Sequence, residues 1–163
     1  MDGFRSTWSR ANAAFGEGEP ASGSEFDDSG RLRELQRVVE TAAPGSRWTG
    51  ATSESYATTN ARRAAVFGDI ADLDQRLGAE VDRSAAVVTA GRRDLDQLRT
   101  WVTDVAASTP QGRSGEWMRM TIATKGIGQI SQIVEQSTTE MGAIGKKLND
   151  IAREYDQLRP IDW

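Results

Sequence analysis

The stretch that decides the fold runs from residue 51 to residue 108 and reads ATSESYATTNARRAAVFGDIADLDQRLGAEVDRSAAVVTAGRRDLDQLRTWVTDVAAS. It contains no proline, and as one continuous helix it would measure roughly 87 Å at about 1.5 Å per residue. Alternating steps of three and four residues meet mostly apolar side chains, the heptad pattern of a helix that packs against another helix. These seam positions are Phe67, Ile70, Asp74, Leu77, Val81, Ser84, Val88, Gly91, Leu95, Leu98, Val102 and Val105.

A second long helix is predicted over residues 114–159, after a break at Thr109-Pro110-Gln111-Gly112. The same alternation of three and four continues through it, with one polar position. Two apolar seams joined by a short break predict an antiparallel helical hairpin. The second seam consists of Met120, Ala123, Ile127, Ile130, Val134, Ser137, Met141, Ile144, Leu148, Ile151, Tyr155 and Leu158.

The register of this hairpin can be predicted by aligning the two seams so that paired residue numbers sum to about 222. This alignment places Phe67 opposite Tyr155, and Ser84 opposite Ser137. Other offsets also pair apolar residues, but the shared serine layer limits the cost of taking either hydroxyl out of water. We therefore expect this register to within one helical turn.

The first 50 residues predict shorter helices and a linker. Residues 1–15 place four apolar side chains on one face of a short helix, which needs a docking surface because isolated helices of that length are marginal. They are Phe4, Trp8, Ala11 and Phe15. We expect an N-terminal region over residues 1–28, a short helix plus a flexible Gly, Ser and acidic linker, and a helical domain over residues 29–163. The helices of that domain are expected at about residues 29–43, 51–108 and 114–159.

These patterns predict an all-α fold, an elongated antiparallel helical hairpin or bundle with a long central helix and short N-terminal helices. A mean hydropathy of −0.55 suits helices that expose much of their surface to water. Seven glycines lie in the interiors of the two long predicted helices, and each costs about 1 kcal/mol relative to alanine. Close helix packing is the expected reason for several of them, with a kink at Gly126 and Gly128 as the alternative. The set is Gly68, Gly78, Gly91, Gly126, Gly128, Gly142 and Gly145.

The composition excludes several functions. The 163 residues include neither cysteine nor histidine, which removes disulfides, Cys/His zinc sites and His-based catalytic relays. A net charge of −4 argues against a nucleic-acid partner. No segment approaches the roughly 18 to 20 apolar residues of a membrane span, and no general secretory signal is evident. We predict no metal, no cofactor and no integral membrane segment.

Catalysis would have to rest on carboxylates, Lys, Tyr or Ser. Acidic residues two positions apart, as in Asp72 and Asp74, point about 200° apart on a helix and cannot share a proton. Asp74 lies on the first seam, and an acid–base pair of Asp74 with Tyr155 is the remaining alternative. We predict that the chain is not an enzyme and has no catalytic residues.

A second apolar stripe runs beside the first seam of the long helix, at multiples of seven residues. It consists of Val66, Leu73, Val87 and Trp101. A two-helix hairpin does not cover it, so a partner protein or another segment must. The N-terminal segments are expected to reach residues 51–63 but not the end near Trp101. A satellite core covered by residues 1–15 is the alternative to a partner interface.

A turn motif separates the second and third predicted helices. Trp48 and Gly50 lie in the turn, and Tyr56 and Asn60 follow in the next helix. A tryptophan ahead of a helix can pack its ring across the junction, and glycine permits backbone conformations closed to other residues. A Trp-x-Gly tripeptide is by itself a weak sequence signal. It is informative here because it lies between two predicted helices.

Residues 48–77, WTGATSESYATTNARRAAVFGDIADLDQRL, resemble the mycobacterial Esp proteins, the ESX (type VII) secretion-associated family that includes EspA and EspE. The shared pattern is Trp-x-Gly, Tyr-Ala-x-x-Asn and Ala-x-Leu-Asp-x-x-Leu. Over residues 78–160 only the helical character and the apolar pattern support the resemblance. The matching residues are Trp48, Gly50, Tyr56, Ala57, Asn60, Ala71, Leu73, Asp74 and Leu77.

The resemblance implies a WXG-type helix-turn-helix substrate, exported folded with a co-secreted helical partner or held by a dedicated cytosolic chaperone. Such substrates carry a Tyr-x-x-x-Asp/Glu export signal. This chain departs from that pattern, because Asn60 follows Tyr56 and Arg159 follows Tyr155 at that spacing. A partner would then supply the signal.

The leading hypothesis is a non-enzymatic ESX secretion-associated protein, a secreted substrate that acts by binding a helical partner. It would be cytoplasmic before export and secreted or envelope-associated afterwards, and a homo-oligomer is compatible with the same pattern. The alternative is a cytosolic chaperone or adaptor for a separately encoded ESX substrate or toxin.

Overall fold

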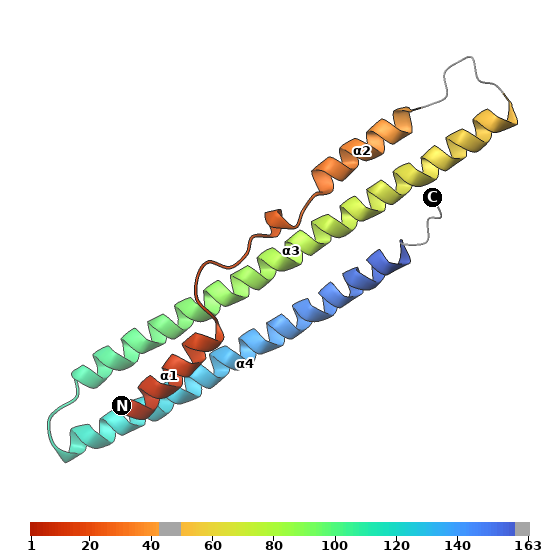
Figure 1. Ribbon diagram of the computed structural model, residues 1–163. Helices are drawn as coiled ribbons and strands as arrows, with labels where there is room; N and C mark the ends of the chain where they lie inside the picture. The colour runs from red at the N-terminus through yellow and green to blue at the C-terminus, as the bar shows by residue number, and fades with distance from the viewer. Residues whose placement is uncertain (43–49, 159–163) are drawn as a thin grey trace. The chain divides into compact units, whose positions relative to one another are not determined.

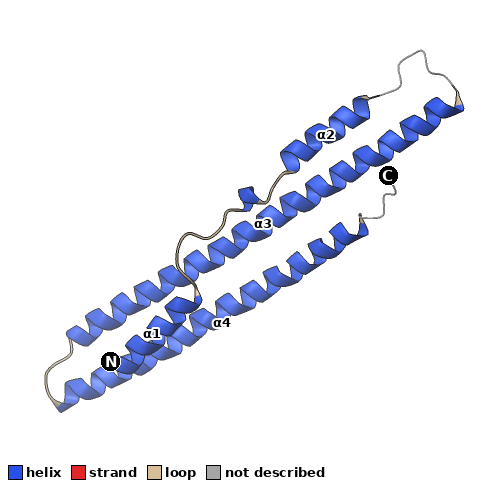
Figure 2. Ribbon diagram, in the orientation of Figure 1, coloured by secondary structure: helices blue, strands red, loops and turns tan. Residues whose placement is uncertain are grey.

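The structure is a computed structural model that describes residues 1–42 and 50–158. Within these ranges no residue lies in a strand (Figure 2). The predicted fold class, all-α with a long central helix and short N-terminal helices, is confirmed. The elements are α1 (Asp2–Ala14), the 3-10 helix η1 (Gly23–Glu25), α2 (Ser29–Thr41), α3 (Ala51–Ala107) and α4 (Arg113–Gln157).

Both long helices begin directly after a glycine with a positive φ. The φ angle is +111° at Gly50 and +96° at Gly112, a region that side chains other than hydrogen disfavour. The carbonyl of Gly50 accepts hydrogen bonds from the backbone N–H groups of Ser53 and Glu54, and the carbonyl of Gly112 accepts one from Glu116. These glycines therefore turn the chain into the first turns of α3 and α4.

The chain divides into two units, and α3 and α4 contribute segments to both. Unit 1 consists of Met1–Pro20 and Arg83–Ile144, and unit 2 consists of Ala21–Asp82 and Gly145–Trp163. The boundary expected between residues 28 and 29 stays a prediction.

In unit 1, α1 packs against α3 and α4 (Figure 1). Phe4 is 2% exposed, and the indole N–H of Trp8 donates to the carbonyl of Leu95 at 2.8 Å. The expectation that N-terminal segments reach only residues 51–63 is wrong for α1, because these contacts hold it beside the second half of α3. The buried core of unit 1 includes Phe4, Ala11, Leu95, Leu98, Val102, Ala123 and Ile130.

In unit 2, α2 lies along α3 (Figure 1). Arg33 pairs with Asp72 at 2.6 Å, and none of the residues of α2 is buried. The expected linker contains an ordered turn, since the backbone N–H of Gly23 in η1 donates to the carboxylate of Asp82 at 2.6 Å. Gly23 also approaches the backbone of Gly78 so closely that a side chain at position 23 would overlap it.

Within unit 1, α3 and α4 run antiparallel, but the predicted register is displaced. The hydroxyl of Ser84 contacts the sulfur of Met141 at 3.5 Å instead of lying opposite Ser137. A β-carbon at Gly126 would lie 2.9 Å from Cγ2 of Val102, a residue that the predicted register places opposite Met120, six residues away. The predicted serine layer therefore does not form.

Within unit 2 the predicted register is wrong by seven residues, which is one heptad. Tyr155 contacts Asp74 instead of Phe67. A shift of one heptad keeps apolar residues in both seams, so periodicity alone cannot distinguish the two alignments. The observed alignment lets the hydroxyl of Tyr155 donate to the carboxylate of Asp74, so that both of these polar groups have a hydrogen-bond partner.

Candidate functional site

The predicted turn motif lies at the junction of α2 and α3 in unit 2. Gly50 immediately precedes α3, Tyr56 is exposed on its second turn, and Asn60 is buried one turn later. Trp48 lies outside the described residues. The functional role of the motif stays a prediction, because the described geometry defines a structural role for Asn60 alone.

Asn60 ties the end of α2 to α3. Its side-chain amide donates to the carbonyl of Ala42 at 2.9 Å, and Ala42 is the residue that caps the C-terminus of α2. The last carbonyls of a helix have no intrahelical donors, so this contact satisfies one of them. The junction is thus fixed by a buried polar side chain, while the ring of Tyr56 faces outward.

The stripe predicted to contact a partner is exposed at one of its four positions. Leu73 is 4% exposed in unit 2 and Val87 is 7% exposed in unit 1, whereas Val66 is half-buried. Trp101 is 40% exposed, and the ammonium group of Lys125 lies 5.7 Å from the centre of its ring. Partner contact by this stripe stays a prediction, and its accessible member is Trp101.

Asp74 and Tyr155, the pair considered for acid–base chemistry, are hydrogen-bonded in unit 2. The hydroxyl of Tyr155 donates to the carboxylate of Asp74. Burial and, second, the hydrogen bond to Asp74 raise the pKa of Tyr155 well above its ordinary value of 10.0. A raised pKa keeps the hydroxyl protonated, which is the opposite of what a general base or nucleophile requires.

Two ion pairs between α3 and α4 accompany the Asp74–Tyr155 bond in unit 2. Arg76 binds Glu154 with two hydrogen bonds of 2.6 and 2.8 Å, and Lys147 binds Glu80 at 2.9 Å. The Arg76 guanidinium, bonded to the Glu154 carboxylate, holds the pKa of that carboxyl below its usual value. This cluster is best explained as a polar contact that sets the register of the two helices.

A groove between α3 and α4 in unit 1, absent from the predicted sites, receives α1. We call it the α1 groove and define it by its lining residues. The ring of Phe4 lies at Gly126, where a β-carbon would come within 2.8 Å of it, and the ring of Phe15 covers Gly91. Close packing is therefore the correct reason for Gly126. The α1 groove is lined by Val87, Val88, Gly91, Leu95, Val102, Ala123, Gly126, Ile130, Val134 and Met141.

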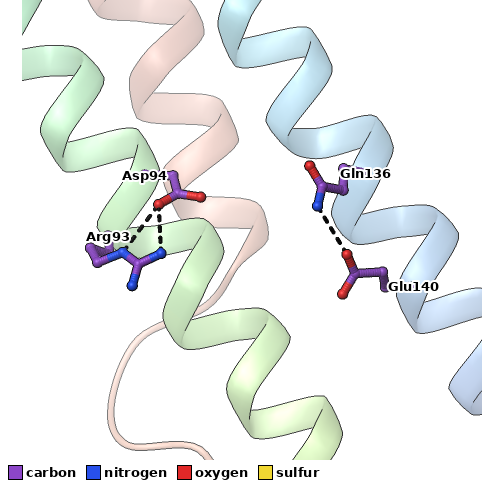
Figure 3. A network of polar contacts seen from close by, with 4 residues as sticks. All are labelled: Arg93, Asp94, Gln136 and Glu140. Atoms are coloured by element: carbon purple, nitrogen blue, oxygen red, sulfur yellow. Dashed lines mark hydrogen bonds and ion pairs between the residues drawn. The ribbon is translucent and has the colours of Figure 1, made fainter.

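Two polar pairs on the surface of unit 1 bond within their own helices. Arg93 pairs with the adjacent Asp94 at 3.0 Å on α3, and Gln136 donates to Glu140 at 3.0 Å on α4 (Figure 3). No dashed contact joins the two pairs in this view. These residues therefore form solvated helix surfaces and do not hold α3 to α4.

Large apolar side chains are exposed near the start of α4. Trp117 is 70% exposed and Met120 is 71% exposed, and Met118 is also exposed. The prediction that Met120 belongs to the second seam is wrong, because Met118, Thr121 and Ile122 lie beside Val105 at the end of α3 while Met120 is exposed. Near the end of a helix, the spacing of apolar residues does not by itself show which face is covered.

Within the described residues, no group of three acidic, cysteine or histidine side chains could hold a metal ion. Among the same residues, no helix is both long enough and apolar enough to span a bilayer. The fold and these surfaces define the class: an all-helical protein whose distinctive chemistry lies in apolar helix faces.

The sequence model of the EspA/EspE family matches residues 15–97, just over half of the chain, and the chain belongs to this family. The match spans η1, α2, the α2–α3 junction and most of α3. A relative is the ESX-1 secretion-associated protein EspE of Mycolicibacterium smegmatis, 26% identical over 95 residues. That alignment covers 58% of this chain and only 18% of the relative. No solved structure matches the chain.

Proposed function

We propose that this chain is a secretion-associated protein of the ESX (type VII) system, acting without catalysis by packing its helices against a helical partner. The observation that carries the proposal is the family match over residues 15–97. The matched range includes the α2–α3 junction. In addition, a relative of the chain is named as an ESX-1 secretion-associated protein. The exposed tryptophans Trp101 and Trp117 support contact with another protein, because large exposed apolar side chains are typical of interaction surfaces.

The finer proposal is an exported substrate. It is cytoplasmic before export and secreted or envelope-associated afterwards, and it travels with a co-secreted Esp or WXG-type protein or with a dedicated chaperone. A homo-oligomer would use the same exposed surfaces. Mass spectrometry of whatever co-purifies with the native chain identifies the partner.

Fractionation tests this proposal. The tagged chain is followed in cells and in culture filtrate, in a strain with an active ESX ATPase and in one whose ATPase is inactivated. We expect the chain in the filtrate only when the ATPase is active, with a cytosolic marker absent from every filtrate. Equal amounts in both filtrates would contradict ESX-dependent export.

One observation favours a cytosolic adaptor as a second candidate. Neither tyrosine is followed by an acidic residue four positions later, since Asn60 follows Tyr56 and Arg159 follows Tyr155. An adaptor would remain in the cells in both strains and would co-purify there with an ESX substrate. The same fractionation therefore separates the two candidates.

Trp101 is the position at which the proposed interface is tested without disturbing the fold. Leu73 and Val87 are buried, so charges there would destabilise the chain itself. We expect Trp101→Glu to weaken partner binding while leaving the helix content unchanged by circular dichroism. Unchanged partner binding by Trp101→Glu would remove the stripe from the interface.

A further inference from the structure

We propose that the α1 groove is a binding site for an amphipathic helix of a partner protein, and that α1 occupies it as an internal competitor. The proposal rests on the proposed function, since it assumes that the chain works by helix packing. The partner helix it specifies has two large apolar side chains spaced like Phe4 and Phe15. It also carries a carboxylate beside the second of these side chains and extends about two turns beyond the length of α1.

The α1 groove has two positions, which we call seats, where a glycine leaves room for an aromatic ring. The first is Gly126 with Val102, where Phe4 is fully buried, and the second is Gly91, under Phe15. A β-carbon on Gly126 or Gly91 would overlap the ring that each now receives. The two rings are eleven residues apart, about three helical turns, so they project from one face of a helix.

α1 is a short occupant with little stabilisation of its own. It has 13 residues and no side-chain hydrogen bond at its N-cap, and isolated helices of this length are marginal in water. Exposed residues follow it, including Gly16 and Gly18 with positive φ angles. The helical state of α1 therefore depends on its contacts with the groove. A helix that makes more contacts with the groove gains binding free energy that α1 lacks.

The α1 groove continues beyond the end of α1. Past Ala14 and Phe15 it is lined mostly by apolar side chains of α3 and α4, among them Val88, Val134 and Met141, with Ser137 and Thr138 beside them. α1 ends at Ala14 and leaves this part of the groove open. A helix longer by about two turns, roughly 10 Å, covers this apolar surface as well and gains the free energy of burying it.

Arg92 makes the α1 groove favour a negatively charged group on the bound helix, at the point where α1 ends. Its guanidinium donates to the carbonyls of Phe15 and Gly18 at 2.9 and 2.5 Å. Its Nε–H is buried and has no acceptor among the described residues. A carboxylate at this point accepts two parallel hydrogen bonds from a guanidinium and binds it more strongly than neutral carbonyls do. The favoured partner helix is therefore acidic beside its second apolar side chain.

Peptide binding to the purified full-length chain tests the inference. The probes are a fluorescent peptide with the sequence of residues 1–15 and an extended one of about 22 residues, which adds a Glu and two Leu on the groove-facing side. The receptors are the wild type, Phe4→Asp, in which α1 is released, and Phe26→Asp, a matched change at an exposed site in unit 2. We expect Phe4→Asp to bind the extended peptide at least about tenfold more tightly than wild type or Phe26→Asp. The extended peptide should also bind Phe4→Asp more tightly than the short one.

Two further variants locate the binding. Met141→Asp, made together with Phe4→Asp, should remove the advantage of the extended peptide. Arg92→Gln in the same background should weaken the Glu peptide more than its Gln counterpart. If Phe4→Asp loses helix content by circular dichroism, Trp8→Ala replaces it, because that change removes the bond to Leu95 without placing a charge in the core.

The inference is overturned if neither peptide binds a folded variant with α1 released, or if all three receptors bind equally. A wild-type dimer that the short peptide dissociates would make a second copy the occupant and would also overturn it. Failure of export in the fractionation experiment leaves these binding constants unaffected. Export without peptide binding contradicts only the inference.

Discussion

Unit 1 and unit 2 each dock a 13-residue helix on α3, and they do so by different means. α1 is held in unit 1 by buried rings, with Phe4 inside the core and Trp8 bonded to Leu95. α2 in unit 2 makes polar contacts, Arg33 to Asp72 and Asn60 to Ala42, and none of its residues is fully buried, although Leu32 and Val39 are half-buried. The difference shows that two helices of equal length can dock on α3 with different contacts, buried aromatic rings in unit 1 and exposed polar side chains in unit 2.

The receiving surfaces explain this difference. α3 and α4 present glycine seats to the rings of α1, whereas α2 meets Gly68 with the polar side chain of Gln36. Leu35 and Val38 of α2 remain exposed. We therefore expect the docking of α1 to be apolar and insensitive to salt, and the docking of α2 to be weaker and sensitive to salt.

The largest effect is expected from Phe4→Ala in unit 1. Removing a fully buried ring costs about 3 kcal/mol of unfolding free energy. This loss cannot exceed the free energy with which α1 docks. Hydrogen exchange should show faster exchange of the α1 amides, and urea unfolding should show the loss of stability. Phe26→Ala, at an exposed ring in unit 2, is the control and should change stability by less than about 0.5 kcal/mol. Equal effects of the two changes would refute the apolar docking of α1.

Glycine replacements in unit 1 should have opposite signs at two positions. Gly91→Ala places a β-carbon against the ring of Phe15 and should destabilise by about 1–2 kcal/mol. Gly142→Ala meets no atom within 4 Å and should stabilise by up to about 1 kcal/mol, because alanine is the better helix former. Urea unfolding of both variants measures the signs. A stabilising Gly91→Ala would mean that Phe15 is not seated there.

In unit 2, Tyr155→Phe removes a polar contact between α3 and α4. It should cost about 1 kcal/mol at neutral pH, because Asp74 loses a donor. The pKa of Tyr155 is raised in the folded state, so above its ordinary value of 10.0 the unfolded state releases the proton first. Wild-type stability should then fall as pH rises above that value, by at most about 1.4 kcal/mol per pH unit from this group. The variant should lack this contribution, and identical pH profiles of the two proteins would contradict the hydrogen bond.

The smallest effect is expected from Arg33→Gln on α2. The ion pair with Asp72 is exposed on both sides, and such pairs contribute between about 0 and 1 kcal/mol. The hydrogen-exchange rate of the α2 amides should rise slightly in the variant, and it should also rise in the wild type at high salt. The exchange rate of the α1 amides should not change with salt. Salt-independent exchange in α2 would show that its docking is not electrostatic.

The helices themselves could be predicted because the evidence for them is local. The spacing of Leu95, Leu98 and Val102 marks a buried face, and Pro110 with Gly112 marks the break between the long helices. The register could not be predicted, because seams repeat every heptad, and the serine layer and the contact of Asp74 with Tyr155 require different alignments. The seat of α1 was missed for a related reason. Gly91 and Gly126 are distant in sequence from the rings that they receive.

The sequence by itself determined the all-helical fold, the positions of the helices and the EspA/EspE resemblance, because periodicity, turn residues and short motifs are properties of neighbouring residues. Only the tertiary structure decided which surfaces remain free. It buried Leu73 and Val87, left Trp117 and Met120 exposed, and placed Phe4 on Gly126. The physical reason is that burial depends on the relative alignment of helices, and alignments one heptad apart differ only in the few polar and glycine positions that must find a matching partner.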